Sequence, residues 1–196
     1  MSEYPYEINP FKLATLLELK EESDEVKERI EYLISKKQKK DGRFEFPARY
    51  LRAGDLFSTM FGVRILLSYS QYKHYRPNIE KALQYVVEHR GDFNTLRDMG
   101  FAVYILARYD FKKYAPIIQE LTEQIISKQV NGKWEGSLED NCWLVIDLLA
   151  VRGRFDDKSL NEKIDIVVEK GIRYIKQVSK QFLKIFLVIY PDQLTN

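Results

Sequence analysis

Three aspartates at the expected starts of helices, and three arginines near them, mark a place where helix N-termini and guanidinium groups could bind an anion. The aspartates begin segments expected to be apolar helices, and the arginines lie shortly before two of these starts: Asp55, Asp98 and Asp140, with Arg49, Arg52 and Arg97. Helix N-termini and guanidinium groups both bind anions, and a diphosphate would suit this combination. Aspartate is also a common capping residue, so we favour the simpler interpretation of capping with surface charge.

Few other residues offer chemistry. Cys142 is the only cysteine, which excludes an intrachain disulfide and a zinc site built on several thiolates. The two histidines, His74 and His89, have no metal-ligand partner at helical spacing. No serine or cysteine nucleophile has an evident base, and no glycine-rich loop suits a phosphate. The sequence therefore predicts no cofactor and no metal.

The charge balance argues against two classes of partner. The chain has 31 basic and 29 acidic side chains, so its net charge of +2 predicts neither a nucleic acid partner nor an anionic membrane surface. The apolar run at residues 182–190 contains Lys184 and is about half the roughly 20 residues that cross a bilayer, so we expect no membrane span. Residues 1–10 lack a signal-peptide pattern, so we expect a cytoplasmic protein.

The elements that must position these residues are helices. Apolar residues recur at intervals of three and four, and alternation at period two is never sustained. Amphipathic and apolar segments alternate, which predicts outer helices at residues 23–37, 78–90, 114–129 and 159–177 and inner helices at residues 55–67, 98–110, 140–150 and 181–190. We expect an all-α protein of about nine helices in one helical-repeat domain. That domain spans residues 1–196, with a lead-in helix in residues 1–23 and four hairpins in residues 24–190.

A short motif follows two of the outer helices. It combines glutamine, Asp or Asn, glycine and an aromatic residue, in the full copies Gln38, Asp41, Gly42 and Phe44, and Gln129, Asn131, Gly132 and Trp134. A degenerate copy keeps only Gly91 and Phe93, and no copy follows Gln177. Glycine permits a left-handed turn, the aromatic packs over the hairpin, and the glutamine bonds backbone groups that the helix end leaves unpaired. The motif therefore predicts architecture rather than chemistry.

The pattern Gln-x-x-Asp/Asn-Gly-x-Trp/Phe resembles the repeat of the terpenoid cyclase and protein prenyltransferase superfamily. The resemblance covers residues 24–190, and only the two full copies are specific. It implies an α/α toroid, or an arc, in which outer helices surround inner ones and the aspartates gather at the mouth of a central cavity. Inner-helix side chains would line that cavity for an isoprenoid: Phe57, Phe61, Phe101, Tyr104, Cys142 and Trp143. Aromatic residues at helical spacing are also typical of an ordinary core.

The resemblance implies catalytic groups from which this sequence departs. Asp140 and Cys142 match the Asp-x-Cys zinc pair of the prenyltransferases, but the family's histidine ligand comes from a later repeat, and no histidine follows His89. We therefore expect Asp140 to cap a helix and Cys142 to be a core residue. The aspartate-rich acid of squalene-type cyclases has only Asp156 and Asp157 as a counterpart, in a charged loop unsuited to a dry acid site.

The leading functional hypothesis is a non-catalytic binding or scaffold protein related to this superfamily, because the repeat is present while the metal and acid residues are missing. Its partner would be an apolar or isoprenoid-like small molecule or a protein, and a homodimer is compatible with this role. The alternative is a small isoprenoid-handling enzyme, prenyltransferase-like or cyclase-like, with its site at the inner-helix N-termini and with Asp55, Asp98 and Asp140 as acids or metal ligands. A second alternative is a superhelical repeat array that binds protein.

Overall fold

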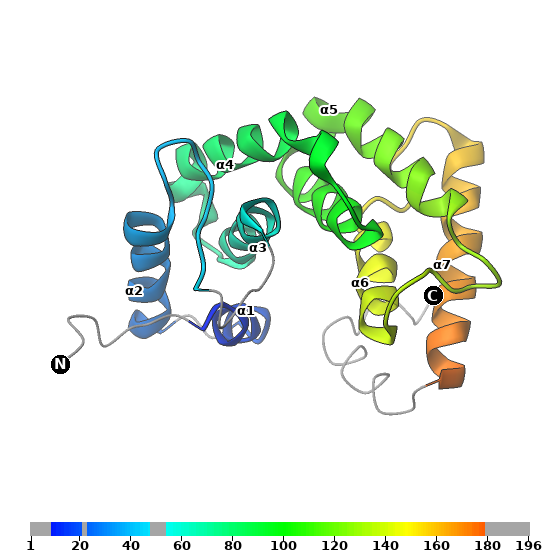
Figure 1. The fold of residues 1–196 in the computed structure, drawn as a ribbon, viewed down its shortest axis with the longest axis horizontal. Coiled ribbons are helices and arrows are strands. Elements are labelled where there is room, and N and C mark those ends of the chain that lie inside the picture. The colour runs from blue at the N-terminus through cyan, green and yellow to red at the C-terminus, as the bar shows by residue number, and fades with distance from the viewer. Residues whose placement is uncertain (1–8, 21–22, 48–53, 179–196) are drawn as a thin grey trace. The chain divides into compact units, whose positions relative to one another are not determined.

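The computed structural model describes residues 9–20, 23–47 and 54–178 of the chain (Figure 1). These residues form seven α-helices, with short 3-10 and π-helical turns and no strand. The all-α prediction is therefore confirmed. The chain divides into two compact units, residues 1–92 and residues 93–196. The predicted inner helix at residues 181–190 lies outside the described residues.

The first unit contains helices α1 (Pro10–Glu18), α2 (Asp24–Tyr32), α3 (Asp55–Ser68) and α4 (Arg76–Glu88). Ser23 is the N-cap of α2, at the first residue of the predicted outer helix, and its hydroxyl accepts a hydrogen bond from the Val26 N–H at 3.4 Å. A π-helical turn, Leu33–Lys37, extends α2 to the first motif. Helix α4 begins earlier than the predicted residue 78, with a proline in its first turn, where the missing N–H costs no helical hydrogen bond.

The second unit contains helices α5 (Leu96–Ser127), α6 (Leu138–Leu149) and α7 (Lys158–Val178). Helix α5 is two helical segments joined at Asp110, whose φ of −158° and ψ of 91° are not helical. The break falls where the inner helix was predicted to end. The second segment begins before the predicted Tyr114, because the Asp110 carboxylate accepts a hydrogen bond from the Lys113 N–H at 3.1 Å. A helix starting at Tyr114 would hold Pro116 in its first turn, whereas the observed start places Pro116 beyond the first turn.

Three predicted inner helices lie in the described residues, and they correspond to α3, the first segment of α5, which is largely buried from residue 100 to residue 107, and α6. Every residue from 57 to 67 on α3 is buried, and α3 packs against α1 and α4. Residues 144–148 of α6 are buried, and α6 packs against α5 and α7. This arrangement within each unit agrees with the predicted alternation of apolar and amphipathic helices. Across the described ranges, no helix combines the length and the apolar character that a membrane crossing requires.

Candidate functional site

The first full motif closes a tight chain reversal and binds to α4. Gly42 has a φ of +98°, and a Cβ atom at this position would overlap the backbone oxygen of Lys81 on α4. The Gln38 carboxamide donates a hydrogen bond to the Asn78 carbonyl at 2.8 Å and accepts one from the Asn78 side chain at 2.7 Å. Glycine is therefore needed both for the turn and for the close approach of α4.

The second full motif makes equivalent contacts with α7. Gly132 has a φ of +83°, and a Cβ atom there would lie 2.7 Å from the Lys170 backbone oxygen. The Gln129 side chain donates a hydrogen bond to the Val167 carbonyl at 2.9 Å. Each motif therefore binds the outer helix that follows the inner helix of its own unit.

A buried polar side chain of the inner helix holds each motif aromatic. Thr59 Oγ1 accepts a hydrogen bond from the Phe44 N–H at 3.0 Å, and Asn141 Oδ1 accepts one from the Trp134 N–H at 2.8 Å. Asn141 also donates to the Trp134 carbonyl at 3.1 Å. Sequence reasoning missed Thr59 and Asn141 because they lie 15 and 7 residues after their aromatics, so no fixed spacing marks them.

The motif prediction was wrong in three details. The pattern Gln-x-x-Asp/Asn-Gly-x-Trp/Phe fits only the first copy, because in the second copy a single residue separates Gln129 from Asn131. The glutamines bind carbonyl groups of a following helix rather than those of the helix end that precedes them. Gly91 is not equivalent to the other two glycines, because its φ is outside the left-handed region and an added Cβ would meet no atom within 4 Å. The degenerate copy at Gly91 and Phe93 therefore lacks this contact.

Two of the three aspartates proposed for the mouth, Asp98 and Asp140, cap the ends of their helices. Asp98 and Asp140 are the third residues of α5 and α6, and each completes a capping box with the N-cap residue, Thr95 and Ser137 respectively. Asp140 Oδ2 accepts hydrogen bonds from the Ser137 N–H at 2.9 Å and hydroxyl at 2.7 Å. These boxes have the Ser/Thr-x-x-acidic signature, which was readable in the sequence. The prediction that the aspartates themselves are N-caps is therefore off by three residues.

The third aspartate lies in the first unit. Asp55 follows the N-cap Gly54 and is the first residue of α3, so it also stands just inside the helix rather than at the cap. Its carboxylate pairs with Arg43 Nη1 at 2.8 Å. The upstream arginines Arg49 and Arg52 lie outside the described residues.

Two of the proposed mouth residues come together in the second unit. Arg97 Nη1 lies 3.4 Å from Asp140 Oδ1, and Arg97 Nη2 lies 3.7 Å from Glu139 Oε1. The guanidinium carbon also lies 5.8 Å from the centroid of the Phe101 ring. The charge of Arg97 is therefore already offset by two carboxylates.

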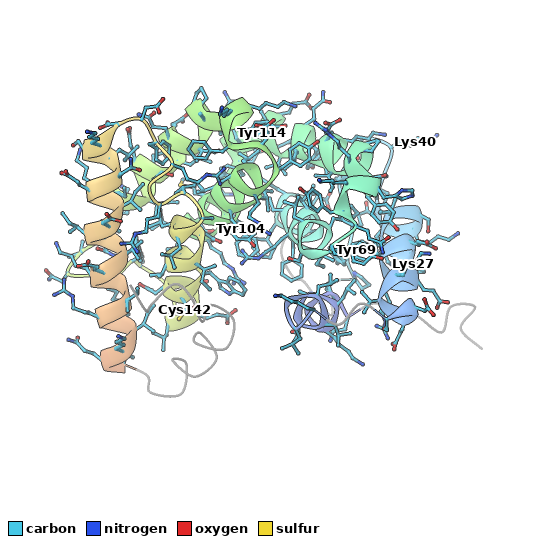
Figure 2. The ribbon with its side chains drawn as sticks, turned by 180° about the vertical axis from the view of Figure 1, so that it is seen from behind. Lys27, Lys40, Tyr69, Tyr104, Tyr114 and Cys142 are labelled. Carbon is cyan, nitrogen blue, oxygen red and sulfur yellow. The ribbon has the colours of Figure 1, made fainter. Side chains whose placement is uncertain are left out.

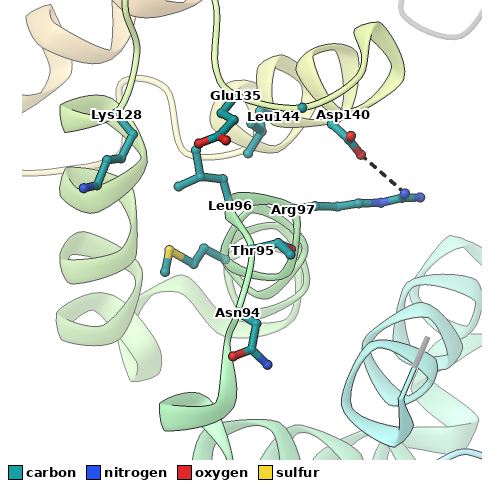
Figure 3. Close-up of a pocket in the computed structure, with 10 residues that line it drawn as sticks. Asn94, Thr95, Leu96, Arg97, Lys128, Glu135, Asp140 and Leu144 are labelled. Carbon is teal, nitrogen blue, oxygen red and sulfur yellow. Dashed lines mark hydrogen bonds and ion pairs between the residues drawn. The ribbon is translucent and has the colours of Figure 1, made fainter.

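A pocket of about 740 Å³ opens beside this pair (Figure 3). Its lining residues come from the start and the C-terminal end of α5, from the loop before α6 and from α6 itself. They are Asn94, Thr95, Leu96, Arg97, Met99, Lys128, Glu135, Gly136, Asp140 and Leu144. In the view of Figure 3 the Arg97–Asp140 pair lies on one side and Lys128 on the other. Of the proposed mouth residues, Arg97 and Asp140 line this pocket.

Four of the six side chains proposed to line a central cavity pack against aromatic rings. Phe57 and Phe61 stack with centroids 6.3 Å apart in the first unit, and Phe101 lies 5.6 Å from Trp143 in the second. The pocket beside Arg97 is lined by none of these four, nor by Tyr104 or Cys142. It is instead lined by charged residues that sequence reasoning missed, Lys128 and Glu135, which flank the second motif.

The Asp140 and Cys142 side chains do not fit a zinc site. Cys142, on α6 (Figure 2), is 5% exposed, and burial, with a smaller effect of the Glu139 charge, raises the pKa of its thiol to about 11. Zinc binds the thiolate, whereas this environment favours the neutral thiol. The Asp140 carboxylate is engaged by Ser137 and Arg97. In the part of the chain that the structure describes, no three His, Cys, Asp or Glu side chains group as metal ligands.

The other aspartate pair also serves a helix end. Asp157 Oδ1 accepts hydrogen bonds from the backbone N–H groups of Ser159 at 2.8 Å and Leu160 at 3.2 Å, at the start of α7. Asp156 is exposed. This placement agrees with the expectation that the loop does not form a dry acid site.

Comparison with models of known protein families and with curated proteins gave no match to this sequence. The function is therefore inferred from the pocket in the second unit and from the charges around it.

Proposed function

We propose that this protein is a non-catalytic binding module whose ligand lies in the pocket of the second unit. One observation supports this proposal above the others: the Asp140 carboxylate at the pocket is occupied by the capping box and by Arg97. Asp140, the residue that the resemblance implies for catalysis, is therefore not available to a substrate or a metal. The other carboxylate of the pocket, Glu135, is exposed rather than held in the dry site that a general acid needs. The pocket wall also contains apolar side chains, which suits binding of a ligand with an apolar part.

We also propose kinship with the terpenoid cyclase and protein prenyltransferase superfamily. The support is that each unit contains one full motif, bound in the same way to the outer helix after its inner helix. A toroid or arc is the architecture that this kinship implies. Small-angle X-ray scattering of the purified chain tests it, because a closed ring and an extended array of the same helices differ in radius of gyration.

The binding proposal is tested by separating turnover from occupancy. The protein is incubated with farnesyl diphosphate and Mg²⁺ while diphosphate release is followed, and farnesol is titrated into ¹⁵N-labelled protein. We expect release at the uncatalysed rate, and farnesol shifts centred on the amide signals of Leu96 and Gly136 at the pocket. Enzymatic diphosphate release would refute the non-catalytic role and favour the isoprenoid-handling enzyme.

A further inference from the structure

Two charged side chains of the pocket have no counter-ion in the described part of the chain. The Lys128 ammonium and the Glu135 carboxylate form no ion pair or side-chain hydrogen bond there, and both residues are exposed. Arg97 and Asp140, in contrast, pair with each other at 3.4 Å. The pocket therefore offers a ligand one available positive charge and one available negative charge.

Apolar side chains accompany these charges. Leu96, Met99 and Leu144 line the pocket, and Leu144 is 1% exposed. The volume of about 740 Å³ is within the usual range for small-ligand sites. The Asn94 side chain also lines the pocket, and its amide can both donate to and accept from a peptide bond.

This charge arrangement disfavours a diphosphate. Arg97 is offset by Asp140 and Glu139, so a multiply charged anion would meet a single available cation, Lys128, and would be repelled by the Glu135 carboxylate. Complementarity in an interface requires opposite charges to face each other, and like charges placed together weaken binding. The best complement is a molecule with one charge of each sign and an apolar middle.

We propose that the pocket binds an amphipathic zwitterion, namely a short peptide with free ends and apolar side chains. The peptide carboxylate pairs with Lys128, the peptide ammonium pairs with Glu135, and the apolar side chains contact Leu96, Met99 and Leu144. This inference rests on the binding function proposed above, and it adds the chemical class of the ligand.

The test uses trileucine in four forms: with free ends, N-acetylated, C-amidated and blocked at both ends. Each is titrated calorimetrically into the full chain at pH 7, where the peptide amine is largely protonated. We expect the free form to bind most tightly, each singly blocked form more weakly, and the doubly blocked form most weakly. Affinity for the free form should fall with added salt, because ion pairs near the surface are screened.

Charge reversal identifies the two groups. Lys128→Glu and Glu135→Lys each replace an attraction by a repulsion, so each should weaken binding of the free form about two- to thirtyfold. The double variant should restore binding, because the zwitterion can then bind with its ends exchanged. Lys163→Glu and Glu162→Lys, at exposed positions on α7 away from the pocket, make the same charge changes and should leave affinity unchanged.

The outcomes separate this inference from the function on which it rests. Equal affinity for the free and doubly blocked peptides overturns the zwitterion inference while leaving a binding pocket. Failure of the double variant to restore affinity overturns the assignment of the two charges and the proposal with it. No binding of any of the four forms up to millimolar concentration overturns the peptide proposal; if farnesol also fails to bind, the binding function falls as well.

Discussion

Replacing Gly132 by alanine tests whether the motif glycine holds two helices together or only permits a turn. Its φ of +83° is unfavourable for alanine, and the new Cβ atom would lie 2.7 Å from the Lys170 backbone oxygen. Real Cβ atoms essentially never approach other atoms so closely, so either the loop or α7 must move. Such a movement disturbs the hydrogen bond from Gln129 to the Val167 carbonyl, now 2.9 Å.

The expected cost has three parts. A left-handed conformation costs alanine about 1–2 kcal/mol, and the stiffer unfolded chain returns about 0.4–1 kcal/mol. Weakening the Gln129 hydrogen bond costs about 0.5–1.5 kcal/mol. Displacing α7 also loosens the contact between Trp134 and Gly171, where a Cβ atom would already lie 3.2 Å from the indole ring. With the loosened Trp134 contact added to these terms, we expect Gly132→Ala to lower the free energy of unfolding by about 1–4 kcal/mol.

Two other glycines provide matched controls. Gly153 has a φ of +68°, but an added Cβ would meet no atom within 4 Å, so Gly153→Ala measures the backbone cost alone. We expect it to cost about 1.5 kcal/mol or less. Gly91 has neither a left-handed φ nor a close contact, so Gly91→Ala should be neutral or slightly stabilising.

The assay is equilibrium unfolding in urea followed by far-ultraviolet circular dichroism, with all three variants compared at constant m-value. Gly132→Ala should shift the midpoint by clearly more than Gly153→Ala. Equal shifts would show that the close approach of α7 contributes nothing to stability. In that case the motif would only mark a turn, and the matching contacts of the motif with α4 and with α7 would not be evidence of a shared stabilising role.

Three further outcomes are expected in the second unit. Asn141→Leu leaves the buried Trp134 N–H without its acceptor and should cost about 2–4 kcal/mol in urea unfolding. Asn141→Asp keeps that acceptor but places a buried carboxylate against the Trp134 and Ser137 carbonyls, to which the amide now donates, so at pH 7 it should cost at least as much. Asp140→Ala removes the capping box with Ser137 and should cost about 1–2 kcal/mol while the helix content of the native protein is unchanged; loss of the fold would contradict a capping role. Burial raises the pKa of the Cys142 thiol from 9.0 to about 11. At pH 8 its reaction with a disulfide reagent should therefore be about a hundredfold slower in the native protein than in the unfolded protein. Rates within tenfold of each other would contradict its burial.

Fold class and the main structural positions could be predicted because they depend on local patterns. The apolar character of residues 56–67 predicts a helix buried on most sides, and the structure buries every residue from 57 to 67. Glycine followed by an aromatic after a helix predicts a left-handed turn, and Gly42 and Gly132 both have positive φ. The same local reasoning failed at Gly91, because sequence shows a residue type but not whether another helix approaches it.

The pocket depends on tertiary contacts that local patterns do not contain. It brings residues 94–99 together with residues 128–144, and the start of α6 must pack beside the start of α5 before Arg97 can reach Asp140. Lys128 and Glu135 carry no sequence signal, because charged residues next to a loop are usually solvated. Asp98 and Asp140 were recognised as capping residues, but the capping boxes with Thr95 and Ser137 were overlooked although their spacing was visible.

The separation of the motif contacts along the chain bears on how the protein is made. Gln38 forms a hydrogen bond to a residue 40 positions later, and Gln129 forms one to a residue 38 positions later. Both partners of each hydrogen bond therefore lie in the same unit. When residue 92 has left the ribosome, the first motif and its partner helix are both available, and domains generally fold as units during synthesis. We therefore expect the first half of a nascent chain to become protease-resistant before the second half has been translated.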